Sequence, residues 1–345
     1  MGTASQALNN KPHVAPETRA RVLEAAESLG YRIPRLAMRA ARRLSIVGML
    51  MKHDIGEPFM VNPFYSYIQA GIEQECQHRN LSLMVANIEV DRRNRPLMWP
   101  PMMLDRRIDG VFVVGAFVED TINQIRQHAD LPIVLVDGYA AGNLFDSVLI
   151  DNVSGAYMAV SYLIQNGHTR IAMVGTAPDA YPSIRERRKG YTRALKRHGI
   201  SRPYFADFDF KECMLSREAG YDATRALLHR EPELTAIFAS NDQVAIGALN
   251  AVRDSGRMVP GDISIIGFDD QDIAHQISPA LTTVRVHKAW MGSLAVQLLC
   301  DRAEHPDRPV VITLVSTELV VRASVRSLSQ GVAAMRGASA MAADG

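Results

Sequence analysis

Four polar residues follow two short apolar stretches in the second half of the chain, at positions where strands of a parallel sheet would end. The stretches 236–239 and 263–266 are β-prone, and a helical pattern of apolar residues between them ends at Gly256. This β-α-β arrangement puts polar side chains just beyond the carboxyl ends of its strands, the edge at which open parallel sheets bind ligands. The first candidates for a ligand site are therefore Asn241, Asp242, Asp269 and Asp270.

The composition is that of an ordinary globular protein with a basic amino end. The 345 residues carry a net charge of +1, with 22% charged and 47% hydrophobic residues, enough for two or three domains with ample cores. Residues 1–44 hold eight Lys or Arg against three Glu, a balance of +5, so the rest of the chain carries −4. A basic N-terminal segment in an otherwise acidic chain indicates a nucleic-acid-binding surface, although charge alone leaves a solvated basic helix as the alternative.

The cysteines and the amino end predict a cytoplasmic protein. Cys76, Cys213 and Cys300 are too far apart in sequence for a metal-binding spacing or an obvious disulfide framework, which fits a reducing compartment. Residues 1–10 are polar and lack the apolar segment of a signal peptide, and no apolar run approaches transmembrane length. We therefore expect no membrane partner.

Alternating strand and helix patterns begin at Ser45 and predict an α/β fold. In the first half we expect strands at 46–51, 81–87, 110–114 and 133–136, and helices at 64–79, 91–105 and 119–129. The pattern restarts at 148–152, and the second half continues with strands at 170–174, 204–209 and 235–238, helices at 153–166, 184–198, 216–229 and 288–302, and a last strand at 311–321. This alternation predicts two doubly wound parallel sheets that meet near residue 150 and enclose a hinged cleft.

Short motifs along most of the chain, from about Gly2 to Arg326, resemble those of the lactose repressor family of bacterial transcription regulators. Any one of them is weak, and all of them in order are specific. The motifs are Thr3 to Asn9, Val14 to Arg19, Leu29 to Tyr31, Ile46 to Gly48, Asn62 to Tyr65, Arg107 to Gly110, Asp151-Asn152, Gly167-His168, Arg187 with Gly190-Tyr191, Asn241-Asp242, Gly267 to Asp270 and Pro279 to Thr283.

The resemblance implies a helix-turn-helix headpiece, a hinge helix and a core similar to type I periplasmic sugar-binding proteins. We expect a partial headpiece at 1–33, a hinge helix or linker at 34–44 and an effector-binding and dimerisation core at 45–326. Within the core, the N-subdomain takes about 45–149 plus 285–313, and the C-subdomain takes about 150–280 plus 314–326. The tail at 327–345 is rich in Ala, Gly, Ser and Met and is expected to be disordered.

The resemblance also implies DNA contacts in the basic amino end. Short polar side chains on a recognition helix reach base edges, and basic side chains of a hinge contact phosphates. The residues so implied are Thr3, Ser5, Gln6 and Asn9 on the helix and Arg39, Arg42 and Arg43 in the hinge.

Two departures from the family's pattern predict an incomplete or damaged DNA-binding headpiece and hinge. The chain begins at the recognition helix, and Ala41 stands where the family carries a Leu that enters the minor groove, unless Leu44 substitutes in a shifted register.

In the core, the resemblance implies an effector bound between the two halves. Arg187 matches the family's ligand-binding arginine and Asp269 its binding aspartate, and a planar fork of donors beside a carboxylate suits sugar hydroxyls. Further candidates are Asn241, Asp137 after the strand 133–136, the aromatic residues Phe64 and Tyr65, and Phe210, for which Phe208 is the alternative. Taken singly, the ordinary interpretations stay open: a solvated arginine, aspartates that cap helices or turns, and aromatic residues of the core.

These features predict a ligand-responsive, DNA-binding repressor and not an enzyme. The sequence has no phosphate-binding glycine loop, nucleophile elbow or metal-spaced His pair, and His168 is expected to be structural. We expect no cofactor and no metal. The expected partners are operator DNA, a carbohydrate effector and a second copy of the chain, with a tetramer as the alternative to a dimer. A stand-alone sugar-binding protein is the rival hypothesis, and the choice between inducer and corepressor stays open.

Overall fold

The computed structural model describes the core of the chain, residues 44–54, 63–91, 95–105, 107–115, 119–128, 131–140, 144–209 and 215–328, besides a few isolated positions. Several of the predictions lie outside the described residues. They are the headpiece and hinge with Thr3, Ser5, Gln6, Asn9, Arg39, Arg42 and Arg43, the candidate Phe210, Cys213, and the tail from residue 329 onward.

The first sheet is entirely parallel, with the strand order β11-β5-β4-β3-β1-β2. Its strands are β1 (Ile46–Asp54), β2 (Ser82–Val90), β3 (Gly110–Val114), β4 (Ile133–Val136), β5 (Asp146–Ile150) and β11 (Ile312–Val315). Side chains alternate between its two faces, and both faces are buried. Phe112 and Val114 pack in the core beneath α3 (Pro63–His78) and α11 (Lys288–Glu304), whereas Val111 and Val113 pack toward α4 (Pro101–Leu104) and α5 (Glu119–His128).

The second sheet has the order β12-β10-β9-β8-β6-β7 and is parallel except for the edge strand β12. Its strands are β6 (Ile171–Thr176), β7 (Tyr204–Asp207), β8 (Ala236–Ala239), β9 (Ser264–Asp269), β10 (Thr282–Arg285) and β12 (Glu318–Val320). Its helices are α6 (Asn152–Gln165), α7 (Pro182–Arg197), α8 (Arg217–Arg230), α9 (Asp242–Asp254) and α10 (Ile273–Gln276). The predicted fold class of two doubly wound parallel sheets is thereby confirmed.

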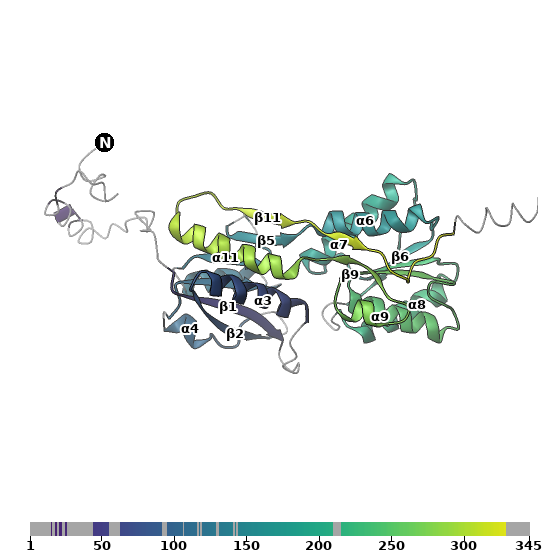
Figure 1. Cartoon of the computed structure of the whole chain (residues 1–345), viewed down its shortest axis with the longest axis horizontal. Helices are drawn as coiled ribbons and strands as arrows, with labels where there is room; N and C mark the ends of the chain where they lie inside the picture. The colour runs from purple at the N-terminus through teal and green to yellow at the C-terminus, as the bar shows by residue number, and fades with distance from the viewer. Residues whose placement is uncertain are drawn as a thin grey trace, which may run out of the picture.

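The chain crosses between the sheets three times, and each crossing is short. It passes from β5 to α6, from β10 to α11, and from β11 to β12 with only Ser316 and Thr317 between the two strands. Figure 1 shows β1, β2 and α3 in one unit and β6, α8 and α9 in the other, with the crossings between them. Below, the unit with the first sheet is called the N-lobe and the unit with the second sheet is called the C-lobe. Short multiple crossings of this kind form hinges between lobes.

Two of the predicted elements are wrong. The strand expected at 311–321 is two strands, β11 in the N-lobe and β12 in the C-lobe. The helix expected at 91–105 is reduced to Pro101–Leu104, because Pro96 and Pro100 cannot donate the backbone hydrogen bonds of a helix interior. The chain instead turns back along β2, where the Leu97 amide donates to the Glu89 carbonyl at 2.9 Å. The pattern restart at 148–152 falls on β5, which pairs with β4 and so belongs to the N-lobe.

His168 is a buried structural residue, as the sequence predicts. Its Nδ1 lies 3.0 Å from the Thr235 hydroxyl, and its Nε2 lies 3.0 Å from the carbonyl of Arg326. The ring thereby connects the end of α6 to β8 and to the last described segment of the chain. Burial lowers its pKa, so the neutral ring is the form that the fold retains.

Candidate ligand site between the two lobes

Strained backbone marks the carboxyl ends of one strand in each lobe. Asp137 follows β4 with φ of 52°, and Asp269 ends β9 with φ of 105°, followed by Asp270 with φ of 48°. Residues other than glycine seldom adopt positive φ, and such residues collect at functional sites when the surrounding structure holds them. The edge where β4 and β9 end is therefore the first place to look for a ligand.

Arg187 lies at the centre of this region, although it stands in a run of charged residues that could have been solvated. It projects from α7 and is 4% exposed. Its Nε donates to Asn152 Oδ1 at 2.9 Å, Nη1 donates to the Ser240 carbonyl at 2.5 Å, and Nη2 donates to Asp269 Oδ1 at 3.2 Å. The guanidinium also stacks on Phe268, 3.8 Å from the ring centroid. A guanidinium has five N–H groups, so these bonds leave donors for a ligand.

Asp137 supplies an acceptor from the opposite lobe. The Tyr65 hydroxyl donates to Asp137 Oδ2 at 3.2 Å, whereas Asp137 Oδ1 is buried and has no hydrogen-bond partner among the described residues. Burial raises the pKa of Asp137 to about 7, although Arg187 and the Tyr65 hydroxyl act to lower it. A buried carboxylate oxygen without a partner is costly, and a ligand hydroxyl would satisfy it.

The carboxylate of Asp269 is also buried, and its pKa is raised. Burial is the main cause, and it outweighs the opposing effects of Arg187 and Lys288. The hydroxyl oxygen of Ser240, just beyond β8, is a second buried polar atom without a partner among the described residues. The region thus combines a guanidinium, an ammonium, two carboxylates and two unsatisfied oxygens, an arrangement that suits a small molecule with several hydroxyls.

Hydrogen bonds between the lobes surround these residues. Tyr139 of the N-lobe donates to Glu186 Oε2 of the C-lobe at 2.9 Å. Tyr67 on α3 donates to Asp272 Oδ2 at 2.5 Å, and Lys52 on β1 donates to the Tyr181 hydroxyl at 3.4 Å. The two lobes are therefore closed on each other in this structure.

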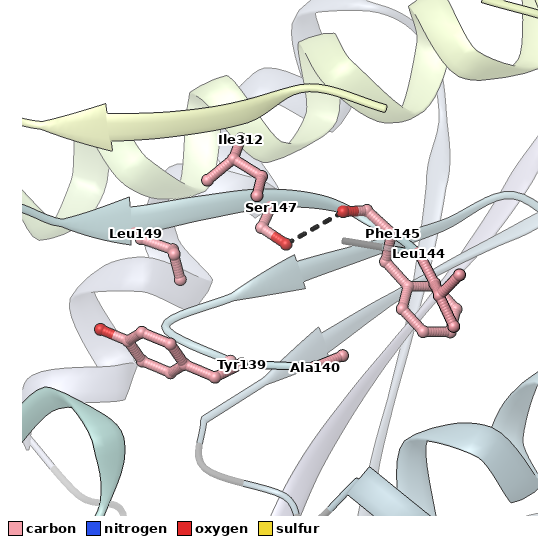
Figure 2. A pocket seen from close by; sticks show the side chains of 8 residues that line it. Tyr139, Ala140, Leu144, Phe145, Ser147, Leu149 and Ile312 are labelled. Atoms are coloured by element: carbon pink, nitrogen blue, oxygen red, sulfur yellow. Dashed lines mark hydrogen bonds between the residues drawn. The ribbon is translucent and has the colours of Figure 1, made fainter. Parts of the chain in front are cut away.

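A small cavity of about 70 Å³ lies against β5, β11 and residues 138–140, which follow β4. Figure 2 shows Tyr139, Leu149 and Ile312 around it, with the Ser147 hydroxyl bonded to the Phe145 carbonyl. None of the predicted effector residues lines this cavity. Because the charged groups converge between the lobes instead, we take that region as the ligand site.

The remaining candidates among the described residues make contacts within the fold. Asn241 Oδ1 caps α9 by accepting from the Val244 amide at 2.9 Å. Phe64 is buried in the core with its ring edge-on to Tyr65, at a centroid separation of 5.2 Å. Phe208, the alternative to Phe210, is also a core residue.

Two of the four aspartate and asparagine residues singled out first hold the C-lobe together. Asp242 is fully buried and accepts from the Thr283 hydroxyl at 2.5 Å and the Gln271 amide at 2.7 Å. The Asp270 carboxylate accepts from Arg285 and Arg322 at 2.8 and 2.6 Å. Both carboxylates are thus bonded within the fold, and their expected role as ligand contacts stays a prediction.

Sequence reasoning missed several residues at this site. Asn152 and Ser240 could have been found by the rule that identified Asp137, because each lies just beyond the carboxyl end of a strand. Tyr139, Glu186 and Lys288 carry no such signal. They reach the site only through contacts made between the lobes.

No helix among the described residues is long and apolar enough to cross a membrane. In the same part of the chain, no group of three or more His, Cys, Asp or Glu residues is arranged to hold a metal ion.

Two hinged lobes that close on buried polar groups define a small-molecule-binding core of the periplasmic-binding-protein type. A periplasmic binding protein-like domain matches residues 160–325, and the model of bacterial regulatory proteins of the lacI family matches residues 1–33. The chain belongs to this lacI family of regulatory proteins, because it is at least 30% identical, over most of its length, to several of the family's repressors.

Two curated relatives illustrate the similarity. The HTH-type transcriptional repressor PurR of Aliivibrio salmonicida is 30% identical over 331 residues, which cover 94% of this chain and 95% of that protein. The ribose operon repressor of Escherichia coli is 32% identical over 312 residues, which cover 88% and 89%. Both are transcriptional repressors, so the chain's relatives are regulators and not enzymes.

Two solved structures are similar across the fold. A complex of the transcriptional regulator CelR with cellobiose is 28% identical, with a TM-score of 0.68 and coverage of 93% of this chain and 94% of that one. A LacI family regulator from Enterococcus faecium with bound ribose is 26% identical, with a TM-score of 0.68 and coverage of 82% and 100%.

Proposed function

We propose that this protein is a ligand-responsive repressor of transcription that binds operator DNA as a homodimer and binds a sugar or sugar derivative between its lobes. One observation carries the proposal: Arg187 and Asp269 of the C-lobe meet Asp137 of the N-lobe in a buried region, where one carboxylate oxygen has no partner. A polyhydroxylated ligand would supply the missing donor and bridge the lobes.

Sugar chemistry fits this set of groups. A carboxylate accepts from two adjacent hydroxyls, a guanidinium donates to two, and the Tyr65 hydroxyl can do either. The relatives named above support the assignment, since CelR is solved with cellobiose, the Enterococcus faecium regulator with ribose, and the Escherichia coli relative is a ribose operon repressor. Two buried carboxylates that accept hydrogen bonds favour a ligand rich in hydroxyl donors over an anionic one.

The DNA-binding part of the proposal rests on the amino end. Residues 1–33 match the lacI family model, and the segment to residue 44 is basic. We assign base contacts to Thr3, Ser5, Gln6 and Asn9 and phosphate contacts to Arg39, Arg42 and Arg43, with the headpiece at 1–33, the linker at 34–44 and the core at 45–326. A dimer follows from operator symmetry, and a cytoplasmic location follows from DNA binding.

Effector binding would act on DNA through lobe closure. The linker enters the N-lobe at Ser45, where Asp109 Oδ2 accepts from the Ser45 and Ile46 amides at 2.8 and 3.0 Å. A ligand that favours the closed arrangement would thereby move a lobe to which the linker is fixed. A coupling of roughly 1–3 kcal/mol is enough for a useful switch.

Two measurements test the proposal. A thermal-shift screen of neutral sugars, sugar acids and purines should show stabilisation by at least one neutral sugar and by none of the anions. Selection of genomic fragments on the full chain should recover a two-fold symmetric site whose gel shift responds to that sugar. A sugar response without any specific DNA site would favour the stand-alone binding protein, and stabilisation only by purines would overturn the sugar assignment.

A further inference from the structure

One cation at the site, Lys288, is not among the residues that the sequence predicts to bind the effector. Lys288 is the first residue of α11, and α11 packs on the N-lobe sheet. The residue is 8% exposed, and its ammonium reaches into the C-lobe, where it donates to the Asp269 carbonyl at 2.5 Å and to the Asp270 carbonyl at 3.2 Å. A lysine from one lobe therefore holds the backbone of the other lobe's candidate binding residue.

The carbonyls that accept hydrogen bonds from Lys288 belong to the strained turn at the end of β9. Asp269 and Asp270 both have positive φ, a strained conformation that residues other than glycine keep only where neighbouring contacts hold it. The side chain of Asp270 is held separately by Arg285 and Arg322. Lys288 contacts the backbone of both residues at once, from the side of the N-lobe.

The surroundings hold the ammonium in place. The Nζ lies 5.9 Å from the ring centroid of Phe64 and 5.5 Å from that of Tyr67, both on α3. Buried ammonium groups need compensating partners, and here two carbonyl dipoles and two aromatic faces provide them. Close packing of α3 on α11 fixes this geometry, because Gly71 lies directly against the Ala289 carbonyl.

We propose that Lys288 is a positioning residue for effector recognition. It fixes the Asp269–Asp270 turn so that the Asp269 carboxylate is presented to Arg187 and the ligand, and it makes that presentation depend on α11, and so on the approach of the two lobes. The proposal rests on the proposed function for the identity of the ligand, but the effect on the turn does not depend on the ligand.

The test compares Lys288→Met with Lys288→Arg and with the matched surface control Lys189→Met on the exposed face of α7. Binding of D-ribose and of cellobiose to the full chain is measured by calorimetry, and hydrogen–deuterium exchange is measured over residues 269–272. Lys288→Met should weaken binding at least about tenfold and accelerate exchange at 269–272 but not in β8. Lys288→Arg should restore most of the affinity, and Lys189→Met should match wild type.

A merely structural role is separated by a double-mutant cycle. If Lys288 acts through Asp269, Lys288→Met should have little further effect on affinity in an Asp269→Asn background, whereas a general loss of stability would add to it. Wild-type affinity and wild-type exchange in Lys288→Met would overturn the proposal. If Lys288→Met fails to fold, Lys288→Gln, which keeps a donor, takes its place.

The two proposals fail in different ways. If the wild-type protein binds neither sugar and no sugar of the thermal-shift screen stabilises it, the sugar assignment is wrong, and the exchange comparison alone decides the role of Lys288. Faster exchange at 269–272 in the variant then supports the positioning role, and unchanged exchange excludes it.

Discussion

The Tyr139 hydroxyl of the N-lobe donates a 2.9 Å hydrogen bond to Glu186 of the C-lobe, and Glu186 immediately precedes Arg187 on α7. Asn152 connects Tyr139 to Arg187, because its Nδ2 donates to the Tyr139 hydroxyl at 3.3 Å and its Oδ1 accepts from Arg187 Nε at 2.9 Å. The bond that joins the lobes and the bonds that orient the arginine therefore form one network. Contact between the lobes and the orientation of Arg187 are thus directly coupled.

Removing the Tyr139 hydroxyl tests this coupling. Tyr139→Phe should weaken effector binding by about fivefold, the equivalent of one hydrogen bond of about 1 kcal/mol, because the closed arrangement loses a bond between the lobes. Calorimetry with the sugar found in the screen measures the change. Tyr221→Phe, which removes a hydroxyl bonded to Asp254 far from the cleft, is the matched control and should leave affinity unchanged. Equal affinity of Tyr139→Phe and wild type would show that this bond does not stabilise the liganded state.

Asp137 should make effector binding depend on pH. Its pKa is raised to about 7 by burial, and a sugar hydroxyl that donates to Oδ1 binds the ionised form better. Affinity should therefore increase as pH rises from about 6 to 8, and Asp137→Asn should remove this increase. Titrations at several pH values measure both slopes. A slope that persists in Asp137→Asn would assign the titration to another group.

The raised pKa of Asp242 should make the stability of the fold depend on pH, independently of effector binding. Burial raises its pKa from 3.8 to about 8, so the folded protein holds a proton that the unfolded chain releases. The free energy of unfolding should therefore fall as pH rises between those values, by up to about 1.4 kcal/mol per pH unit. Asp242→Asn can keep the bonds to Thr283 and Gln271 and should flatten this slope. Urea denaturation at pH 5, 6, 7 and 8 gives the measurement, and an equally steep fall in the variant would contradict the assignment.

The contact between α3 and α11 leaves no space for a methyl group at Gly71. A Cβ there would lie 1.9 Å from the Ala289 carbonyl oxygen, so the two helix backbones would have to separate. Gly71→Ala should lower the free energy of unfolding by about 1–3 kcal/mol, because overpacking outweighs the gain in helix propensity. Ala70→Ser, at the exposed neighbouring position, should change it little. Chemical denaturation of both variants tests the packing that places Lys288 beside Phe64.

Most of the fold could be predicted from the sequence because buried parallel strands are short apolar runs separated by amphipathic helices. The strand 311–321 could not be divided, since β-prone residues continue across Ser316 and Thr317, and only tertiary pairing sends β11 and β12 to different sheets. At the site, Arg187 and Asp269 were found through motifs that resemble a known family. Tyr139, Glu186 and Lys288 were not found, because their partners are distant in sequence and become neighbours only when the lobes close.

Effector binding should depend most directly on Arg187, the residue proposed to hold the ligand. Calorimetry should compare wild type, Arg187→Ala and the exposed neighbour Arg185→Ala with the sugar found in the screen, after circular dichroism has shown that each variant is folded. Arg187→Ala should lose affinity by about a hundredfold, as expected when a buried charged partner is removed, while Arg185→Ala should bind like wild type. Wild-type affinity in a folded Arg187→Ala variant would contradict the role of Arg187 in effector binding.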